Sequence, residues 1–384
     1  MKKPGAKRII LVASNDLEGD QRLHKVALTL QKRNWEPVLF GRKLKVSGPL
    51  SRPYPVKRIK LLFSKGPAFY ACFNIRVFFH LLFIRADLFV ANDLDTLASV
   101  WLASRFRRKA VIYDSHEYFT GVPELADRKR VQGIWKSIER RIQPKLDSVI
   151  TVNDSIAELF KDEYHKDVVV IRNLPLKKPA RIIPGYIPSE FMGLPLLIYQ
   201  GAVNVGRGLE QLIEAMKHLP EYRLLIAGGG DRLQDLIRMT GENGLEGQIH
   251  FTGRIPFEQM RWYTQQANIG VSLEQDIGLN YRLSLPNKLF DYMHSGLPVI
   301  ASDLPEIKKV VLEAGFGMVI SDFSPSSLSN YIRSLWENQL MYNELRNNAL
   351  SKASKYTWEE QEALLLDVYD RAFSQVNHNT PRLL

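Results

Sequence analysis

The segment from Leu283 to Ser302, LSLPNKLFDYMHSGLPVIAS, holds a lysine and a carboxylate at a spacing suited to nucleotide binding. Pro286 predicts the first position of a helix, so Lys288 and Asp291 project from the same face of it. The N–H groups of a helix N-terminus and a lysine attract phosphate, and a carboxylate one turn on can accept hydrogen bonds from the two hydroxyls of a ribose. Two interpretations stay open: a site for a nucleoside diphosphate, or a surface Lys–Asp pair worth a few tenths of a kcal/mol.

Other polar residues follow predicted strands, at the edge where parallel α/β sheets bind ligands. In the first half of the chain these residues are Asn15, Asp16, Asp20, Asp93, Asp95 and His116. His116 stands among carboxylates at a strand end, which favours a functional role over that of a structural histidine. Asp93 and Asp95 are similar to the acidic residues that hold a divalent metal in some sugar transferases, but such a pair before a helix is more often a cap with a first-turn charge.

In the second half, glycines gather at the same positions. Gly201 to Gly208, with Arg207 just before a helix, is a second candidate phosphate contact. Gly228 to Gly230 either admits a phosphate or makes a tight turn before a helix that opens near Asp231.

Strand and helix patterns alternate along the chain and must position these residues. Strands are expected at 8–13, 37–40, 88–91, 110–113, 148–152 and 168–171, and again at 196–199, 223–227, 249–252, 269–273, 299–301 and 318–320. Helices are expected between them, for example at 20–32, 94–106 and 134–141, and at 326–338, 341–355 and 358–372 without intervening strands. Such alternation predicts parallel sheets covered by helices.

The proline- and glycine-rich segment 174–195 interrupts this alternation. The sequence therefore predicts an α/β protein with two doubly wound domains, 1–174 and 196–355, joined by a linker, 175–195. Residues 356–384 are expected to form a helix that packs back on the first domain, followed by a tail. A cleft between two facing polar rims is the expected active site.

Composition excludes several other classes of protein. The single cysteine, Cys72, excludes an internal disulfide and a cysteine-rich metal site and favours a reducing cytosol. The N-terminal MKKPGAKRIILVAS has no signal-peptide cleavage site. The apolar stretch 69–84 contains Asn74, Arg76 and His80, which predicts a buried helix rather than a membrane span.

Positive charge is concentrated near the start of the chain. The formal net charge is +11, yet residues 1–65 hold 16 Lys and Arg against 4 Asp and Glu, and Gly41–Lys65 has eight basic residues and no acidic one. Two interpretations remain: an anionic membrane surface, with Leu61, Leu62 and Phe63 as apolar contacts or as a buried strand, or a solvated basic face. Nucleic acid is not expected, because no nucleic-acid-binding module accompanies the charge.

Taken together, the motifs resemble a known family. The order YQGAVNVGRGLEQLIEAM, LLIAGGGD, FTGRIP, SLEQD and LPNKLFDYMHSGLPVIAS, with NDLEGDQR, YDSHE, TVN and IRNLP in the first half, is similar to the retaining nucleotide-sugar glycosyltransferases of family 4 type (glycosyl transferases group 1). That resemblance spans nearly the whole chain and implies the GT-B architecture, two facing Rossmann-like domains with a cleft between them.

It also implies roles for individual residues. Arg207 and Lys288 are expected to bind the donor diphosphate, Asp291 the ribose, and His116 the donor sugar. The implied catalytic residues are His116, Arg207 and Lys288, the donor-binding residues are Gly201, Arg207, Gly229, Arg254, Ile255, Lys288, Leu289 and Asp291, and the acceptor-side residues are Asn15, Asp16, Asp20 and Asp93.

Two positions depart from the family pattern. Leu283 stands where the first glutamate of the paired-glutamate motif is expected, and Ala202 replaces an arginine. A related subset with SLPNKLFEY-type sequences also lacks that glutamate, so the chain is not interpreted as inactive. The donor sugar and the phosphate contacts are the properties affected.

The expected function is retaining transfer of a sugar from a UDP- or GDP-linked donor to a hydroxyl of a saccharide or lipid-linked saccharide, in polysaccharide or glycolipid synthesis. No cofactor and no metal are expected, and the location is expected to be cytoplasmic, peripheral on the inner face of the membrane. The alternatives are a nucleotide-sugar epimerase of the same architecture and a degenerate, non-catalytic nucleotide-sugar-binding subunit.

Overall fold

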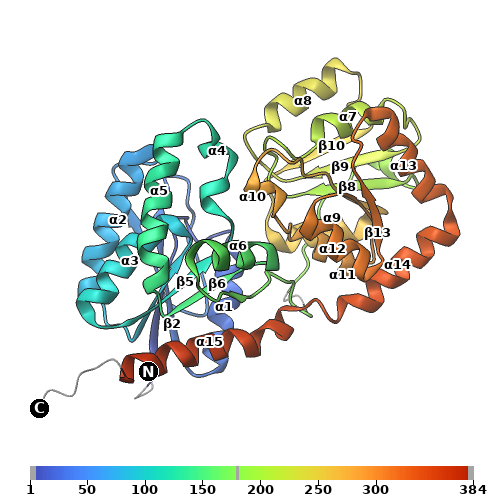
Figure 1. Cartoon of the computed structure of the whole chain (residues 1–384). Coiled ribbons are helices and arrows are strands. Elements are labelled where there is room, and N and C mark those ends of the chain that lie inside the picture. Colours follow the sequence, from blue (N-terminus) through green and yellow to red (C-terminus); the bar gives the residue numbers. More distant parts are fainter. Residues whose placement is uncertain (1–5, 179–180, 379–384) are drawn as a thin grey trace, which may run out of the picture. The chain divides into compact units, whose positions relative to one another are not determined.

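The computed structural model describes residues 6–178 and 181–378; Pro179 of the expected linker, the first five residues and the tail 379–384 lie outside the described residues. The chain divides into two compact units, each built on its own parallel sheet (Figure 1). Unit 1 comprises the residues up to Asn173 together with those from Gln361, and unit 2 comprises Leu174–Glu360.

Unit 1 has a seven-stranded parallel sheet of order β3-β2-β1-β4-β5-β6-β7. Its strands are β1 Arg8–Val12, β2 Glu36–Lys43, β3 Val56–Lys60, β4 Leu88–Asn92, β5 Ala110–Ser115, β6 Ser148–Thr151 and β7 Val169–Val170. The central strands β1 and β4 are apolar and buried on both faces, as expected of a parallel sheet with helices on each side.

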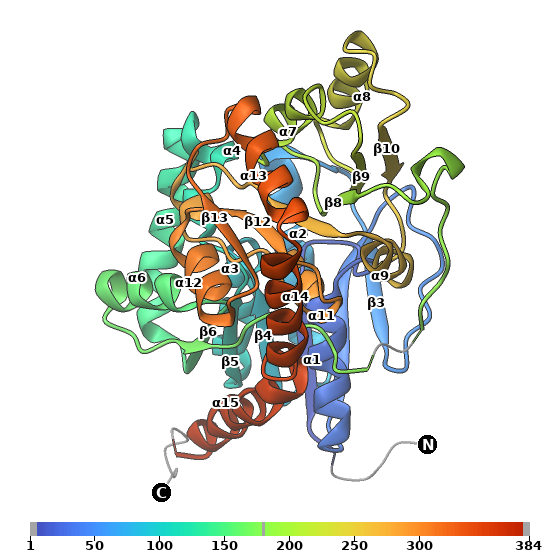
Figure 2. The same ribbon diagram turned by 90° about the vertical axis from the view of Figure 1, so that its right-hand side faces the viewer.

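The helices of unit 1 are α1 Gln21–Lys32, α2 Gly66–Phe83, α3 Leu94–Arg107, α4 Pro123–Ala126, α5 Lys129–Ile142, α6 Asp154–Tyr164 and α15 Trp358–His378. The crossover from β1 to β2 runs opposite to those from β3 to β4, β4 to β5 and β5 to β6. Right-handed crossovers therefore place α1 on one face of the sheet and α2, α3 and α5 on the other. α15 runs beside α1, where Glu362 accepts hydrogen bonds from Thr29 and Lys32 (Figure 2).

Unit 2 has a six-stranded parallel sheet of order β10-β9-β8-β11-β12-β13. Its strands are β8 Leu196–Gln200, β9 Arg223–Ala227, β10 Ile249–Gly253, β11 Ile269–Ser272, β12 Val299–Ser302 and β13 Gly317–Ile320. Its helices are α7 Leu209–Met216, α8 Leu233–Glu242, α9 Phe257–Gln266, α10 Leu279–Arg282, α11 Lys288–His294, α12 Pro305–Ala314, α13 Pro325–Glu337 and α14 Gln339–Ala353. Buried apolar clusters lie on both faces of this sheet.

The α/β class and the two doubly wound sheets predicted from the alternation are confirmed. Strand β3 was not anticipated, whereas α6, α9 and α12 lie between predicted strands, where helices were expected. β3 has only one buried side chain, Ile59, among four lysine, arginine and valine neighbours, so it carries no apolar run to mark it.

Helix α2 departs from the expected buried helix. Phe69, Phe73, Val77 and Leu81 form its buried stripe, but Ile75, Phe79 and Phe83 on the other side are 58%, 55% and 86% exposed. By length and composition α2 is the one helix among residues 6–178 and 181–378 that is apolar enough to cross a membrane. Its buried stripe is part of the core of unit 1.

Residues 174–195 were expected to be a linker, and most of this segment packs on unit 2. Ile187 and Phe191 lie in the same apolar cluster as β8 and α11. The amide of Tyr186 donates to the Tyr263 hydroxyl at 2.9 Å. The proline and glycine content therefore marks an irregular but packed segment.

Candidate active site

Each sheet has one point at which its strand order reverses. In unit 1 the reversal lies between β1 and β4, and in unit 2 it lies between β8 and β11. Helices leave opposite faces of the sheet at such a point, so the carboxyl ends of the two strands line a crevice that binds ligands in open α/β sheets. The polar residues singled out in the sequence lie at these two places.

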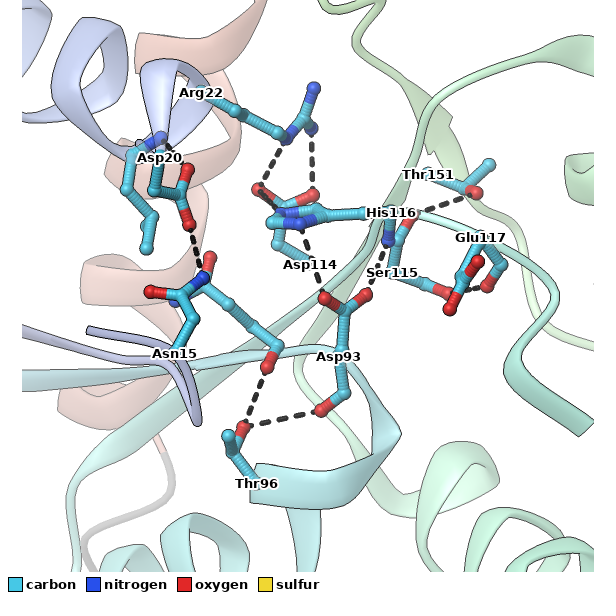
Figure 3. Close-up of polar contacts among 12 residues, drawn as sticks. Asn15, Asp20, Arg22, Asp93, Thr96, Asp114, Ser115, His116, Glu117 and Thr151 are labelled. Carbon is cyan, nitrogen blue, oxygen red and sulfur yellow. Dashed lines mark hydrogen bonds and ion pairs between the residues drawn. The ribbon is translucent and has the colours of Figure 1, made fainter. Parts of the chain in front are cut away.

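In unit 1 the crevice is lined by a charged cluster around His116, which follows β5 (Figure 3). Its Nδ1 lies 3.2 Å from Asp93 Oδ2, and its Nε2 lies 3.5 Å from Asp114 Oδ2. The other oxygen of Asp93 accepts a hydrogen bond from the His116 amide at 2.8 Å. Arg22 of α1 donates two hydrogen bonds to Asp114, at 2.7 and 3.1 Å, and a third to the carbonyl of Ile171.

These contacts determine the charges. Burial disfavours ionisation of His116, but the carboxylates of Asp93 and Asp114 raise its pKa well above the usual value. Burial also disfavours ionisation of Asp114, but Arg22 and His116 hold the pKa of that carboxyl well below its usual value. At neutral pH the cluster is therefore an imidazolium held between two carboxylates. The His116 side chain is 21% exposed, and as an imidazolium it is not available as a base.

Asp93 does not cap α3, contrary to the favoured sequence interpretation. It occupies the N-cap position with φ of 64°, and its side chain binds His116 instead of the helix amides. A positive φ at a residue other than glycine is strained and is retained where the surrounding contacts require it. Asp95 is buried in the first turn of α3, and burial together with Asp93 raises its pKa to about 7.

The first-loop residues that were predicted to lie on the acceptor side bond mainly to one another. Asn15 donates to Asp20 at 2.8 Å and accepts from the Leu17 amide, while Asp16 accepts from Ser47. Asp20 also caps α1 through the amide of Leu23. The loop is therefore ordered by its own side chains at the edge of the sheet where Asp93 and Asp114 lie.

In unit 2 the crevice is built around a buried glutamate, Glu274, which follows β11. Its Oε1 lies 2.7 Å from Lys288 Nζ and 3.5 Å from Arg207 Nη1, and its Oε2 accepts from Ser272 at 2.6 Å. The two cations predicted to bind phosphate thus converge on one carboxylate. Burial lowers the pKa of Lys288 to about 8, with Glu274 opposing and Arg207 reinforcing this effect.

Glycines allow Lys288 and the neighbouring loops to approach closely. A Cβ on Gly201 would lie 3.7 Å from the Lys288 side chain, and Lys288 Nζ lies 3.9 Å from the centre of the Tyr199 ring. A Cβ on Gly228 would lie 1.8 Å from the carbonyl oxygen of Gly201. Gly228 is therefore required by the packing of two loops. Gly229 lies against Arg254, with 3.4 Å from its ideal Cβ position to the Arg254 Cβ.

Asp291 accepts a hydrogen bond from a residue at the end of strand β8, Gln200. Its Oδ2 accepts a hydrogen bond from Gln200 Nε2 at 2.7 Å, and Gln200 Oε1 in turn accepts from Thr264 at 2.6 Å. Lys288 and Asp291 therefore face the carboxyl ends of β11 and β8, on the two sides of the strand reversal. The surface-pair interpretation of these two residues is wrong, since Lys288 is only 7% exposed and its ammonium donates to buried Glu274.

Two details of the donor-binding prediction need correction. Helix α11 begins at Lys288, so Pro286 lies two residues before it, and its carbonyl accepts from the Leu289 amide. Leu289 is fully buried in an apolar cluster of unit 2, so its side chain is a core residue and not a ligand contact. Ile255 packs partly against the same cluster. The two residues that depart from the family pattern have structural contacts. Leu283 caps the C-terminus of α10, and the backbone carbonyl of Ala202 accepts a hydrogen bond from the Tyr199 hydroxyl.

Sequence reasoning assigned no role to the three residues that hold the site together, Arg22, Gln200 and Glu274. The partner of each lies far away in the sequence, so nothing local shows that the charge or amide is buried against another side chain. Among the described ranges 6–178 and 181–378, no group of three or more His, Cys, Asp and Glu side chains is arranged to hold a metal ion.

Comparison with known families now decides the class. The sequence model described as Glycosyltransferase Family 4 matches residues 20–174, and that described as Glycosyl transferases group 1 matches residues 188–352. This chain belongs to the family 4 type of GT-B glycosyltransferases. The two matches fall on the two units; the first contains Arg22, Asp93, Asp114 and His116, and the second contains Arg207, Glu274 and Lys288.

Individual relatives are distant. An uncharacterized glycosyltransferase of Methanocaldococcus jannaschii is 25% identical over 321 residues, 78% of this chain and 79% of the relative. A GDP-mannose:cellobiosyl-diphosphopolyprenol alpha-mannosyltransferase of Xanthomonas oryzae is 25% identical over 46% of this chain and 47% of its own length.

Solved structures resemble this chain over most of its length. The sucrose-phosphate synthase of Thermosynechococcus elongatus has a TM-score of 0.78 at 18% identity and covers 96% of this chain and 100% of its own. HepE of Anabaena, solved with UDP and glucose, has a TM-score of 0.72 at 15% identity and covers 95% and 99%. At these identities the likeness concerns the fold.

Proposed function

We propose that this glycosyltransferase moves a sugar from a nucleoside diphosphate sugar to a hydroxyl acceptor with retention of configuration. The observation that carries the proposal is the convergence of Lys288 and Arg207 on buried Glu274 at the strand reversal of unit 2. Two cations held at fixed positions suit a diphosphate, whose negative charge grows as its bond to the sugar breaks.

In the proposed reaction the bond between the anomeric carbon and the diphosphate oxygen breaks, and the acceptor oxygen bonds to the same face of the sugar. The acceptor proton passes to the leaving phosphate, so no protein nucleophile is required. Asp291, which is positioned by the hydrogen bond from Gln200, accepts hydrogen bonds from the ribose hydroxyls. His116 supplies a hydrogen-bond donor to the donor sugar, a role that suits an imidazolium better than that of a base.

Lys288 and Arg207 would neutralise the diphosphate without a divalent cation, so we propose that the reaction is independent of metal. The similarity to enzymes named for GDP-mannose, and the fold likeness to a structure solved with UDP, make UDP- and GDP-linked sugars the donors to examine first. A saccharide or lipid-linked saccharide is the proposed acceptor, in line with the polyprenol-linked substrate in the name of the Xanthomonas relative.

Nucleotide screening followed by product analysis tests this function. UDP or GDP should raise the thermal midpoint of the wild-type protein, and the effect should be much smaller for Asp291→Ala. With the matching nucleotide sugar and an acceptor pool, nucleotide release should require acceptor, and the new glycosidic bond should keep the donor's anomeric configuration by NMR. Conversion of nucleotide sugar in the absence of acceptor would instead identify an epimerase. Nucleotide binding without release under any condition would identify a non-catalytic subunit.

A further inference from the structure

One face of unit 1 combines exposed apolar side chains with charges of a single sign. Helices α2, α3 and α5 lie side by side on this face, on the side of the sheet opposite α1 (Figure 1). Its exposed apolar side chains are Ile75, Phe79 and Phe83 of α2, Leu102 and Phe106 of α3, and Ile134 of α5. Phe83 and Phe106 are 86% and 73% exposed, although aromatic side chains of this size are usually largely buried.

These apolar residues of α2 repeat at helical spacing. Ile75, Phe79 and Phe83 are four residues apart and so form a stripe on the side opposite the buried Phe69–Leu81 stripe. A helix that is apolar all round is ordinarily enclosed, whereas one side of α2 faces solvent in this structure. The Phe78 ring links the stripe to α3 through an edge contact with Phe106, with 5.7 Å between ring centres.

The charges on this face are all positive. The only carboxylates within α2, α3 and α5 are Asp95 and Glu139, and both are buried. Every charged side chain of these helices that is exposed or half-buried is basic: Arg76, Arg105, Arg107, Lys129, Arg130, Lys136, Arg140 and Arg141. Three of these are held by their own fold, since Arg76 and Arg107 donate to backbone carbonyls and Lys136 pairs with Glu163, so the remaining five supply most of the charge. In contrast, the adjoining helix α6 exposes Glu158, Asp162 and Glu163, so the positive face ends there.

We infer that this face, formed by α2, α3 and α5, docks on an anionic lipid bilayer. Exposed phenylalanines surrounded by arginines suit the boundary between acidic headgroups and acyl chains, where apolar burial and charge attraction add. A second copy of this chain is disfavoured, because a two-fold contact would place basic side chains against basic side chains. The inference does not depend on the proposed transfer reaction.

The basic segment 41–65 contributes less than its sequence suggests. Arg42, Arg52 and Arg58 donate to backbone carbonyls of Ser64, Glu18 and Gly48, which holds them against their own fold. Leu62 and Phe63 are 87% and 51% exposed, so they form no buried strand. They precede α2, which begins at Gly66.

Vesicle co-sedimentation tests the inference on the full chain. The wild type should bind vesicles containing phosphatidylglycerol at low salt and remain in the supernatant with pure phosphatidylcholine. Arg105→Glu/Arg140→Glu removes two attractive charges and should lower the partition coefficient at least about 30-fold. Phe83→Ser/Phe106→Ser should lower it about tenfold, because less apolar surface enters the headgroup region.

Matched controls come from exposed positions of unit 2. Lys178→Glu/Lys355→Glu makes the same change in net charge, and Leu340→Ser removes an apolar side chain that is 87% exposed. All variants should keep the wild-type circular dichroism and nucleotide response. Recovery in the supernatant under every condition overturns the inference, as does equal loss of binding in the unit 2 controls.

Two further outcomes would also overturn it. If only the charge variant loses vesicle binding, Phe83 and Phe106 do not enter the headgroup region and the inferred mode of docking is wrong. If sedimentation velocity shows a wild-type dimer that Phe83→Ser/Phe106→Ser converts to a monomer, the face is covered by a second copy.

Discussion

Replacing Lys288 by methionine should weaken unit 2 as well as donor binding. Lys288 is the 2.7 Å partner of a fully buried carboxylate, so the substitution leaves Glu274 with only Arg207, at 3.5 Å, as a compensating charge. Removing one partner of a buried ion pair costs about 3–5 kcal/mol of unfolding free energy. Because Arg207 remains and methionine keeps the packing of the lysine stem, we expect a loss near the lower limit, about 3 kcal/mol.

A double variant separates the two effects. In Lys288→Met/Glu274→Gln the buried charge is also removed, so about 2 kcal/mol of stability should return, while donor turnover should stay about 100-fold or more below wild type. Urea unfolding gives the global stability, and hydrogen exchange of peptides from 269–293 reports on unit 2 alone. The exposed pair of Lys308 and Asp303, 3.0 Å apart, supplies the control: Lys308→Met should cost under about 1 kcal/mol.

This reasoning is refuted if Lys288→Met is as stable as Lys308→Met, or if the added Glu274→Gln fails to restore stability. Restored turnover in the double variant would leave the stability argument intact but remove Lys288 from the reaction.

Other predictions concern the same clusters. Asp291→Ala should weaken nucleotide binding about tenfold or more, measured by calorimetry, since it loses a ligand to the ribose; unchanged affinity would refute the assignment. The kcat/KM for donor should fall above about pH 8, where Lys288 loses its proton. Asp114→Asn should lower the free energy of unfolding by about 3 kcal/mol, because it leaves the buried guanidinium of Arg22 without its partner. The wild type should lose stability as the pH falls below about 4, where the Asp114 carboxyl is protonated in the unfolded state but still ionised in the fold. This loss should be smaller in Asp114→Asn. Turnover should survive EDTA; complete loss that manganese or magnesium restores would show a metal requirement.

Most of the fold was predictable because a buried parallel strand is a local signal. Arg223–Ala227 was predicted with its observed bounds, since five apolar-rich residues stand between polar turns. Val56–Lys60 was not predicted, because this edge strand buries only one side chain and its basic sequence is typical of a loop. Helix α2 was found but misjudged, because composition gives its length and apolarity and does not show that one side lacks a partner.

The site was predictable to a different degree in its two parts. Lys288, Asp291 and His116 stand at recognisable places, a helix start and a strand end, and the structure brings each to a strand reversal. Glu274 could not be assigned from sequence, because its role depends on two side chains 14 positions after it and 67 positions before it. Asp93 was interpreted as a cap because capping is a local rule, and its contact with His116 is not local.

The division of unit 1 into two chain segments affects how the protein is made. Leu365, Val368, Tyr369 and Ala372 of α15 are completely or almost completely buried, yet they are translated only after the whole of unit 2, Leu174–Glu360. At usual rates of synthesis those intervening residues take about 10–40 s. During that time unit 2 can fold on the ribosome as a continuous segment, whereas the surface of α1 that receives α15 stays uncovered. Nascent unit 1 is therefore the part of this enzyme that most needs a chaperone.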